Sequence, residues 1–377
     1  MAECTAFGEE WKGFGGAWEL IRSAELRMLG SFWLTPRRVG FPMRSLASLA
    51  GGEKHATPAH DPVATAGCIL REDQMREVGP EHSGLASNGF VLETTADRLG
   101  HLKATDPGEG LGEIRERLAT DGYLWLKGLL RRHEVIDLRR RILSALEPLG
   151  LLAVGTDLAE GIFAGHDEHR GEAHRVLGEV VRWEAFEAFC ASKAVQALFE
   201  ALFGCDIHLH RRKILRYTVP GDPSCTGAHY DLTYLRAGSD GVCTAWIPIG
   251  DTPVEMGGLI YLEGSDAAGR AMEAAYAPSN ASLAPGERIS AYNKNMTAEG
   301  WVTKDLPSLA RRLNSRWLVA DYEAGDVVVH SAYMIHAATV NNDPARRIRL
   351  STEIRYQSVT ERIDTRWNSD WTPDDGL

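Results

Sequence analysis

The chain has 377 residues, of which 44% are hydrophobic and 25% are charged, as is typical of a soluble globular protein. Its formal net charge of −11 argues against a nucleic-acid-binding protein, since such a protein normally carries a basic face. The same charge gives no support to binding at an anionic membrane. The sequence also predicts no transmembrane helix, because it contains no run of about 18 apolar residues.

The six cysteines are scattered along the chain, and no two of them have the spacing of a Cys-x-x-Cys motif. Such a distribution is typical of free thiols in a reducing compartment. The N-terminal residues lack the basic segment and the apolar core of a secretory signal peptide. We therefore expect a cytoplasmic protein with a small-molecule substrate and no nucleic-acid or membrane partner. The sequence does not indicate the oligomeric state.

The first part of the chain differs from the rest. Residues 1–75 show no sustained hydrophobic period and include LAGGEKHATPAHDPVATAG, which is typical of a loop or linker. We expect an N-terminal extension over 1–75, which could be poorly ordered, and one domain over 76–377. Within that domain, helical periods occur at 111–121 and 133–149, with the predicted strand YLWLKGLL between them. A further helical block is predicted at 182–203.

From residue 206 onward, short β-rich runs alternate with Gly, Pro and Asp turns, which predicts a β-sandwich or barrel. Residues 266–316 interrupt these runs with polar and Ala-rich sequence, which predicts helices and loops that cover one open end of the barrel. The predicted fold is therefore mainly β with flanking helices (α+β), with the N-terminal helices packed on a double sheet. The runs are DIHLHRRKILRYTV, AHYDLTYLRA, GVCTAWIPIGD, GGLIYLEGS, RWLVADY, GDVVVHSAYMIHAATV and RIRLSTEIRYQ.

The run GAHYDLTYL at 227–235 holds a histidine and an aspartate one residue apart. In an extended strand, His229 and Asp231 point to one face and Tyr230 points to the other. Two histidines and one carboxylate on one face suit Fe(II) and leave positions open for chemistry. Downstream, the histidines are His330 and His336, and the strand pattern alone leaves open which of them is the third ligand.

The run RRIRLSTEIR predicts a strand with two unlike faces. The polar face carries Arg347, Arg349, Ser351, Glu353 and Arg355. The other face is apolar and can pack on helices, which turns the polar face into the barrel. An arginine in such an interior needs an anion, and a dicarboxylate cosubstrate would supply one through a bidentate pair.

With these residues the chain resembles the phytanoyl-CoA dioxygenase-like family of Fe(II)/2-oxoglutarate oxygenases over about residues 113–358. The resemblance implies a double-stranded β-helix core of the jelly-roll or cupin-like kind. It also implies that iron is held by His229, Asp231 and His336, because the distal histidine of the family follows the Gly of a Gly-Asp turn by eleven residues, here Gly325. The similar segments are ATDGYLWLKGLLRRHEVIDLRRRI, VPGDPSCTGAHYD, TAWIPIGDTPVEMGGLIYLEGSD and GDVVVHSAYMIHAATVNNDPARRIRLS.

The family resemblance further implies a set of residues around 2-oxoglutarate. Arg347, eleven residues after the distal histidine, would bind its far carboxylate. Tyr230 and Trp246 correspond to family residues near the cosubstrate. Ala338 stands where the family has Ser or a similar residue, so that hydrogen bond is lost. The family's Lys before the Pro-Gly turn is also absent, and Arg216 could take its place.

The activity implied by this resemblance is oxidation, and by default hydroxylation, of a small metabolite of secondary metabolism. Fe(II), 2-oxoglutarate and O2 would take part, and succinate and CO2 would be released. Two other interpretations use the same His/Asp/His site: a catalytically silent jelly-roll protein that binds a ligand, and a zinc-dependent hydrolase. Arg347 speaks against both, since neither requires a residue for 2-oxoglutarate.

Overall fold

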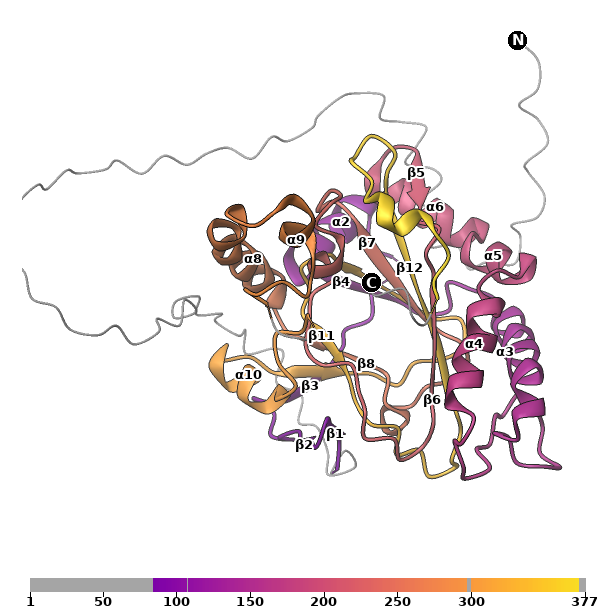
Figure 1. Ribbon diagram of the computed structural model, residues 1–377. Helices are drawn as coiled ribbons and strands as arrows, with labels where there is room; N and C mark the ends of the chain where they lie inside the picture. Colours follow the sequence, from indigo (N-terminus) through magenta and orange to yellow (C-terminus); the bar gives the residue numbers. More distant parts are fainter. Residues whose placement is uncertain (1–83, 107, 297–299, 373–377) are drawn as a thin grey trace, which may run out of the picture. The chain divides into compact units, whose positions relative to one another are not determined.

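The β-strands lie at the centre of the described chain, with helices around them (Figure 1). The computed structural model describes residues 84–106, 108–296 and 300–372, which belong to a single compact unit. The extension expected over 1–75 lies outside these residues. Among the described helices, none is long and apolar enough to cross a membrane.

A large antiparallel sheet forms one side of the core. Its strands follow the order β4-β10-β7-β12-β5, and β6 also pairs with β12. The strands are β4 (Tyr123–Leu126), β5 (Ile207–Leu209), β6 (Ile214–Thr218), β7 (Cys243–Pro248), β10 (Val327–Ser331) and β12 (Arg349–Ser358). The ten-residue β12 thus joins β7 on one side to β5 and β6 on the other.

A smaller sheet forms the opposite side, in the order β11-β8-β9-β3. Its strands are β3 (Leu99–His101), β8 (Leu259–Leu262), β9 (Trp317–Val319) and β11 (His336–Ala338). The β3–β9 pair is parallel, whereas β8 pairs antiparallel with both of its neighbours. A separate hairpin is formed by β1 (Ala86–Ser87) and β2 (Phe90–Val91).

Side chains from both sheets share one buried interior. Trp125, Trp246 and Val328 of the large sheet belong to the same apolar cluster as Tyr261 of the small sheet and Tyr322. Alternation along each strand sends every second residue into this interior. The predicted jelly-roll fold with flanking helices is confirmed, since two mainly antiparallel sheets enclose one core.

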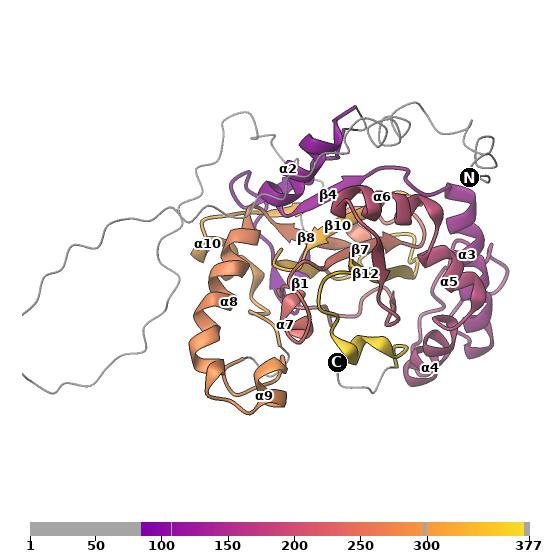
Figure 2. The ribbon, with the colours of Figure 1, turned by 90° about the horizontal axis from the view of Figure 1, so that it is seen from above.

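Helices from the N-terminal part of the domain pack on the outer face of the large sheet (Figure 2). Phe199 of α6 stacks on Tyr356 of β12 at a centroid distance of 4.4 Å, and the Tyr356 hydroxyl donates to the carbonyl oxygen of Cys190 in α5 at 2.9 Å. The apolar face predicted for this strand is therefore the one that the helices cover. These helices are α2 (Leu111–Asp121), α3 (Arg132–Leu146), η3 (Glu147–Leu149), α4 (Arg170–Val180), α5 (Glu184–Cys190) and α6 (Lys193–Phe203).

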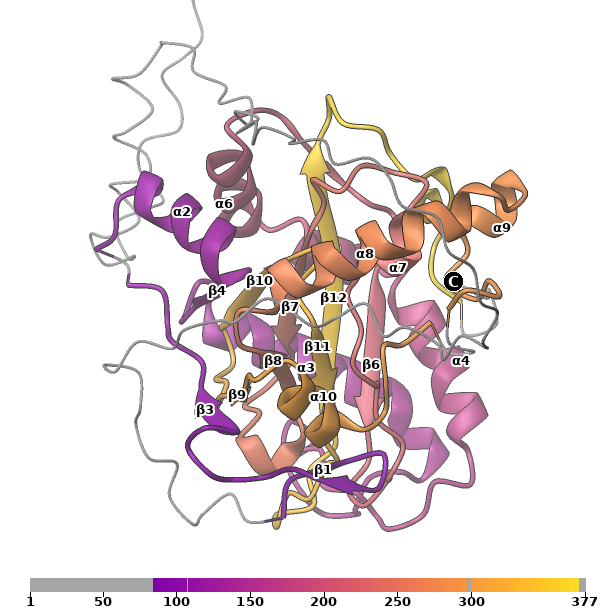
Figure 3. The ribbon, with the colours of Figure 1, turned by 90° about the vertical axis from the view of Figure 1, so that its left-hand side faces the viewer.

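A second group of helices lies against the small sheet (Figure 3). Met272 of α8 and Leu309 of α10 belong to the cluster that contains Ile260 and Leu262, the outward-facing residues of β8. Helix α9 instead lies against α7, next to the predicted metal ligands. The helices are α8 (Ser265–Ala281), α9 (Pro285–Ile289) and α10 (Leu306–Arg312), and short turns occur at η4 (Val254–Met256) and η5 (Thr365–Asn368).

The run AHYDLTYLRA was expected to be a strand, and this is wrong beyond His229. His229 exchanges two main-chain hydrogen bonds of 3.0 Å with His336, as a strand residue would. The backbone of Asp231 is already helical (φ −64°, ψ −31°), and helix α7 (Leu232–Leu235) follows. Leu232 and Leu235, three residues apart, both enter the core, which suits a helical turn and not an alternating strand.

The close approach of α8 to the segment after β10 gives a stability prediction. A methyl group added at Gly269 would lie 2.1 Å from the carbonyl oxygen of Tyr333, so Gly269→Ala must push the helix outward. We expect this overpacking to lower the free energy of unfolding by about 1–3 kcal/mol. Gly171→Ala in α4 is the matched control, because its added methyl has no described atom within 4 Å. Denaturant unfolding of both variants tests this, and equal stability would contradict the packing described.

Candidate active site

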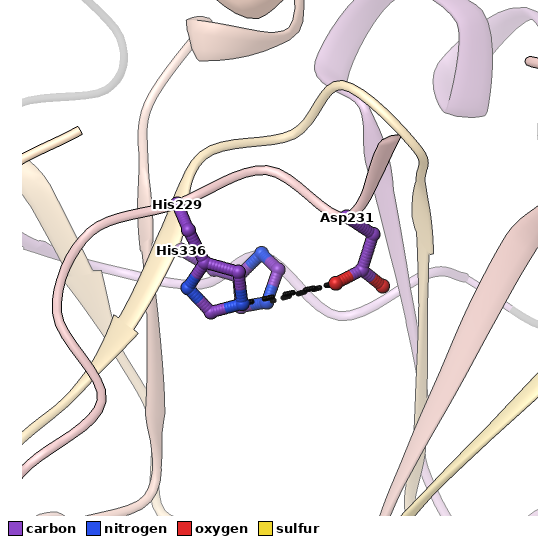
Figure 4. A group of neighbouring side chains, drawn as sticks. All are labelled: His229, Asp231 and His336. Atoms are coloured by element: carbon purple, nitrogen blue, oxygen red, sulfur yellow. Dashed lines mark ion pairs between the residues drawn. The ribbon is translucent and has the colours of Figure 1, made fainter. Parts of the chain in front are cut away.

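Three predicted ligands converge inside the barrel (Figure 4). His229 pairs with β11, His336 begins β11, and Asp231 precedes α7. Oδ1 of Asp231 lies 3.7 Å from Nε2 of His229 and 3.8 Å from Nε2 of His336. All three side chains are buried, and their ligand atoms lie within 4.8 Å of one another. One cation can therefore contact two imidazole nitrogens and a carboxylate oxygen.

Main-chain carbonyl groups orient both imidazole rings. Nδ1 of His229 lies 2.9 Å from the oxygen of Gly227, and Nδ1 of His336 lies 2.9 Å from the oxygen of Met334. Because a carbonyl can only accept, each Nδ1 carries the proton and each Nε2 keeps its lone pair for a metal. Burial lowers the pKa of both histidines, which favours the neutral form that binds metals.

The two carboxylate oxygens of Asp231 have different surroundings. Oδ2 accepts from the Thr244 hydroxyl and from Nη2 of Arg355 at 3.2 Å, and Nε2 of His330 lies 3.4 Å away. Oδ1 is buried yet accepts no hydrogen bond from any residue that the structure describes. Burial alone would raise the pKa of Asp231, but Arg355 and the nearby histidines lower it well below its ordinary value. An ionised oxygen without a partner beside two neutral imidazoles fits Fe(II).

His330, the other histidine left open by the sequence, is not part of this ligand group. Its Nδ1 lies 3.1 Å from the Tyr261 hydroxyl, and its Nε2 faces Oδ2 of Asp231, the oxygen that also accepts from Thr244. The side chain is fully buried on β10. The structure thus brings His336 together with His229 and Asp231, and it places His330 behind the carboxylate.

Arg347, which was predicted to bind the far carboxylate of 2-oxoglutarate, pairs with Asp343 in the structure. Its guanidinium makes two 2.8 Å hydrogen bonds to Asp343. The acidic groups that raise its pKa include Asp343, Asp251 and Glu160, none of which belongs to the triad. The main-chain bend before β12 accounts for this: Arg346 has a positive φ of 58°, and the strand begins after Arg347. The arginine that was predicted to bind 2-oxoglutarate therefore forms an ion pair with Asp343.

Arg349 lies inside the barrel instead. Its Nη1 donates to the carbonyl oxygen of Gly257 and its Nη2 to the hydroxyl of Thr218, both at 2.7 Å. Its Nε has no partner, and the side chain has no carboxylate partner, among the residues described. Burial lowers the pKa of Arg349 to about 10, which still leaves it charged at neutral pH. A buried cation bound by neutral groups alone is favourable only when an anion joins it.

The remaining predicted cosubstrate residues have mixed positions. Trp246 lies on the same face of β7 as Thr244, inside the barrel, and Ala338 belongs to the same interior cluster. Arg216 faces the interior and donates from Nε to Glu353 at 2.8 Å. Tyr230 points away from the triad, and its hydroxyl donates to Glu273 of α8 at 2.8 Å. The structure therefore does not bring Tyr230 to the metal ligands.

Sequence reasoning missed the residues that hold Asp231. Thr244 lies in the run GVCTAWIPIGD, where nothing marks it as different from other strand threonines. Arg355 was visible as a member of the polar face of β12, but its partner could not be read from that pattern. Knowing which strands pair would have shown that Arg355 faces Asp231 across the barrel.

Comparison with known proteins agrees with this geometry. Residues 118–348 match the family described as phytanoyl-CoA dioxygenase (PhyH). The chain belongs to the phytanoyl-CoA dioxygenase family. Members of this family use Fe(II), 2-oxoglutarate and O2, and the protein is accordingly an oxidoreductase of the dioxygenase class.

Relatives of this family member include two named enzymes. The 1-deoxypentalenic acid 11-beta-hydroxylase of Streptomyces arenae is 26% identical over 63% of this chain and 78% of its own length. The enzyme of the same name from Streptomyces exfoliatus is 22% identical over 72% of this chain and 88% of its own.

Two solved structures are also similar to it. The epimerase SnoN from nogalamycin biosynthesis, in complex with Fe3+, alpha ketoglutarate and nogalamycin RO, is 19% identical over 67% of this chain and 85% of its own (TM-score 0.44). EctD from S. alaskensis, in its apoform, is 14% identical over 77% of this chain and 93% of its own (TM-score 0.45).

The contact between Thr244 and Asp231 gives a prediction for metal affinity. Thr244→Val removes the hydroxyl that donates to Oδ2, so Asp231 is less firmly oriented and Fe(II) affinity should fall by roughly ten- to a hundredfold. Thr352→Val is the matched control, because that hydroxyl donates to the carbonyl oxygen of Ile214 on the other face of β12. Anaerobic Fe(II) titration measures both affinities. An equal loss in the two variants would show a general effect of the missing hydroxyl.

Proposed function

We propose that this dioxygenase hydroxylates a small organic metabolite and converts 2-oxoglutarate and O2 to succinate and CO2 in the same cycle. The observation that carries the proposal is the buried His229–Asp231–His336 group, with its unpartnered carboxylate oxygen, next to the buried Arg349. The names of two relatives support it, since both are hydroxylases of a small organic acid.

The protein's own part in this reaction is to bind and orient. Iron held by the triad supplies, with 2-oxoglutarate and O2, an oxidant that can break a substrate C–H bond. Asp231 contributes one negative charge, and its Oδ2 accepts from Thr244 and Arg355, so Oδ1 is the oxygen that would hold the metal. With only His229, Asp231 and His336 as protein ligands, a bound metal would have room for the cosubstrate and O2. The buried apolar cluster around Trp246 and Tyr261 would help to exclude water from the site.

We assign the far carboxylate of 2-oxoglutarate to Arg349. Arg347 was predicted for this role, but Asp343 neutralises it, whereas Arg349 is buried without a carboxylate in the described chain. The Thr218 hydroxyl accepts from this guanidinium and stands where the family has a lysine. Trp246 and Ala338 share the interior with it, as the family resemblance implies for residues around the cosubstrate.

Arg349→Gln should therefore weaken 2-oxoglutarate affinity by roughly ten- to a hundredfold, because a charge-assisted hydrogen bond contributes about 1.5–3 kcal/mol and each 1.4 kcal/mol is tenfold in affinity. Arg347→Gln is the matched control and should change that affinity by less than about threefold. Anaerobic titration of the Fe(II)-loaded variants with 2-oxoglutarate gives both values. A large effect in Arg347→Gln with none in Arg349→Gln would return the role to Arg347.

The proposed reaction has a direct test in iron-dependent succinate release during a metabolite screen. His336→Ala should abolish both iron binding and succinate release, since it removes a ligand. His330→Ala should keep one iron per chain and most of the turnover, because His330 lies behind Asp231 and outside the ligand group. Iron retained by His336→Ala and lost by His330→Ala would show that the distal ligand is misassigned.

The same measurements separate the two other interpretations. A silent binding protein would hold its ligand without any release of succinate. A zinc-dependent hydrolase would act on its substrate with Zn²⁺ and without 2-oxoglutarate. The absence of any iron-dependent consumption of 2-oxoglutarate across the screen would refute the proposed function.

A further inference from the structure

Arg216 differs from the other arginines that the described structure places on the interior faces of β6 and β12. It pairs in register with Ser351 of β12, and its charge acts on both Asp231 and Tyr234. Its side chain is 41% exposed, although Arg349 and Arg355 are almost fully buried. Part of the Arg216 side chain is therefore in contact with solvent, unlike the side chains of the two other arginines.

One edge of the Arg216 guanidinium is available for a ligand. Glu353 binds its Nε side at 2.8 Å and is itself almost fully buried. The two terminal amino groups have no hydrogen-bond partner among the residues that the structure describes. Because a guanidinium can bind one carboxylate on its side and another at its end, Arg216 can accept a second anion without releasing Glu353.

The charges of the loaded site also call for another anion. Arg216, Arg349 and Arg355 carry three positive charges, and Fe(II) adds two. Asp231 and Glu353 carry two negative charges, and 2-oxoglutarate adds two. With the ligating histidines neutral, one positive charge remains. 2-Oxoglutarate has Arg349 and the metal as partners for its two carboxylates, and Arg355 lies against both Asp231 and Glu353. Arg216 has Glu353 alone, which it shares with Arg355, so its open edge is the place for the added anion.

Apolar surface lies next to this charge. The Tyr234 ring is 5.8 Å from the His229 ring, and its charged neighbours include Arg216. Tyr292, which is 48% exposed, lies 6.4 Å from Tyr234 between ring centroids. Aromatic faces bind apolar groups well and bind carboxylates poorly. A ligand that fits both features has an apolar body and one anionic end.

We propose that the substrate is a hydrophobic monocarboxylic acid, and that Arg216 binds its carboxylate while its body lies over Tyr234 in front of the triad. This inference rests on the proposed function, because it assumes that iron and 2-oxoglutarate occupy the triad and Arg349. It also gives Arg216 a role other than the cosubstrate contact that the family resemblance allows.

The test uses a panel of compact apolar carboxylic acids, such as 1-adamantanecarboxylic acid and the linear C8–C12 acids, each matched with its primary amide. Binding is measured by anaerobic calorimetry on the full chain loaded with Fe(II) and 2-oxoglutarate. The wild type should bind at least one acid about ten- to a hundredfold more tightly than its amide, as expected for a charge-assisted pair. Arg216→Lys should keep most of that preference.

Two further variants separate recognition from folding. Arg216→Gln leaves Glu353 with only its more distant partner Arg355, so the double variant Arg216→Gln/Glu353→Gln removes both charges together. Both variants should lose the preference for acid over amide and should keep 2-oxoglutarate affinity within about threefold of the wild type. Loss of 2-oxoglutarate affinity with the acid preference retained would make Arg216 a cosubstrate residue and overturn the inference.

The wild-type titrations distinguish failure of the carboxylate site from failure of the proposed function. If Fe(II) and 2-oxoglutarate bind but no acid in the panel binds better than its amide, the carboxylate site is refuted and the proposed function stands. If neither Fe(II) nor 2-oxoglutarate binds, the proposed function fails and the inference fails with it.

Discussion

The unequal surroundings of the two Asp231 oxygens are the constraint around which the centre of this protein is arranged. One oxygen is held by Thr244 and Arg355, which come from neighbouring strands of the large sheet. The other faces two histidines that pair with each other through the small sheet. The carboxylate thus joins the two halves of the jelly roll, and the ligand group forms only when both sheets are in register.

Burying so many charges requires that almost every one has a partner. Glu353 illustrates this: burial alone would raise its pKa, yet Arg216 and Arg355 lower it to about 2. Asp231, Arg355, Glu353 and Arg216 form a continuous series of ion pairs across the interior. Arg349 stands outside this series. An unpaired interior charge is costly in a folded protein, and such a residue is therefore more informative about a ligand than any of the paired ones.

Predictions from sequence patterns were correct where the local backbone geometry is regular. Strand alternation correctly placed Arg349, Glu353 and Arg355 on one interior face, because β12 is an uninterrupted strand of ten residues. The same counting did not predict the ion pair of Arg347 with Asp343, four residues earlier, which forms where the left-handed Arg346 precedes the strand. It failed again after His229, where buried leucines three residues apart favour a helical turn over a strand. Contacts between distant segments, such as Thr244 with Asp231, have no local signal.

The hydrogen bonds that the two imidazole rings donate to the carbonyl oxygens of Gly227 and Met334 have a consequence for metal choice. Main-chain groups already hold both ligands in place, so binding a cation requires little rearrangement. A rigid pair of imidazoles with one carboxylate binds Co²⁺, Ni²⁺ and Zn²⁺ at least as tightly as Fe²⁺, following the Irving–Williams order. The protein itself thus has little means of rejecting the wrong ion. Which ion fills the site therefore depends more on the divalent metals available than on the ligands themselves.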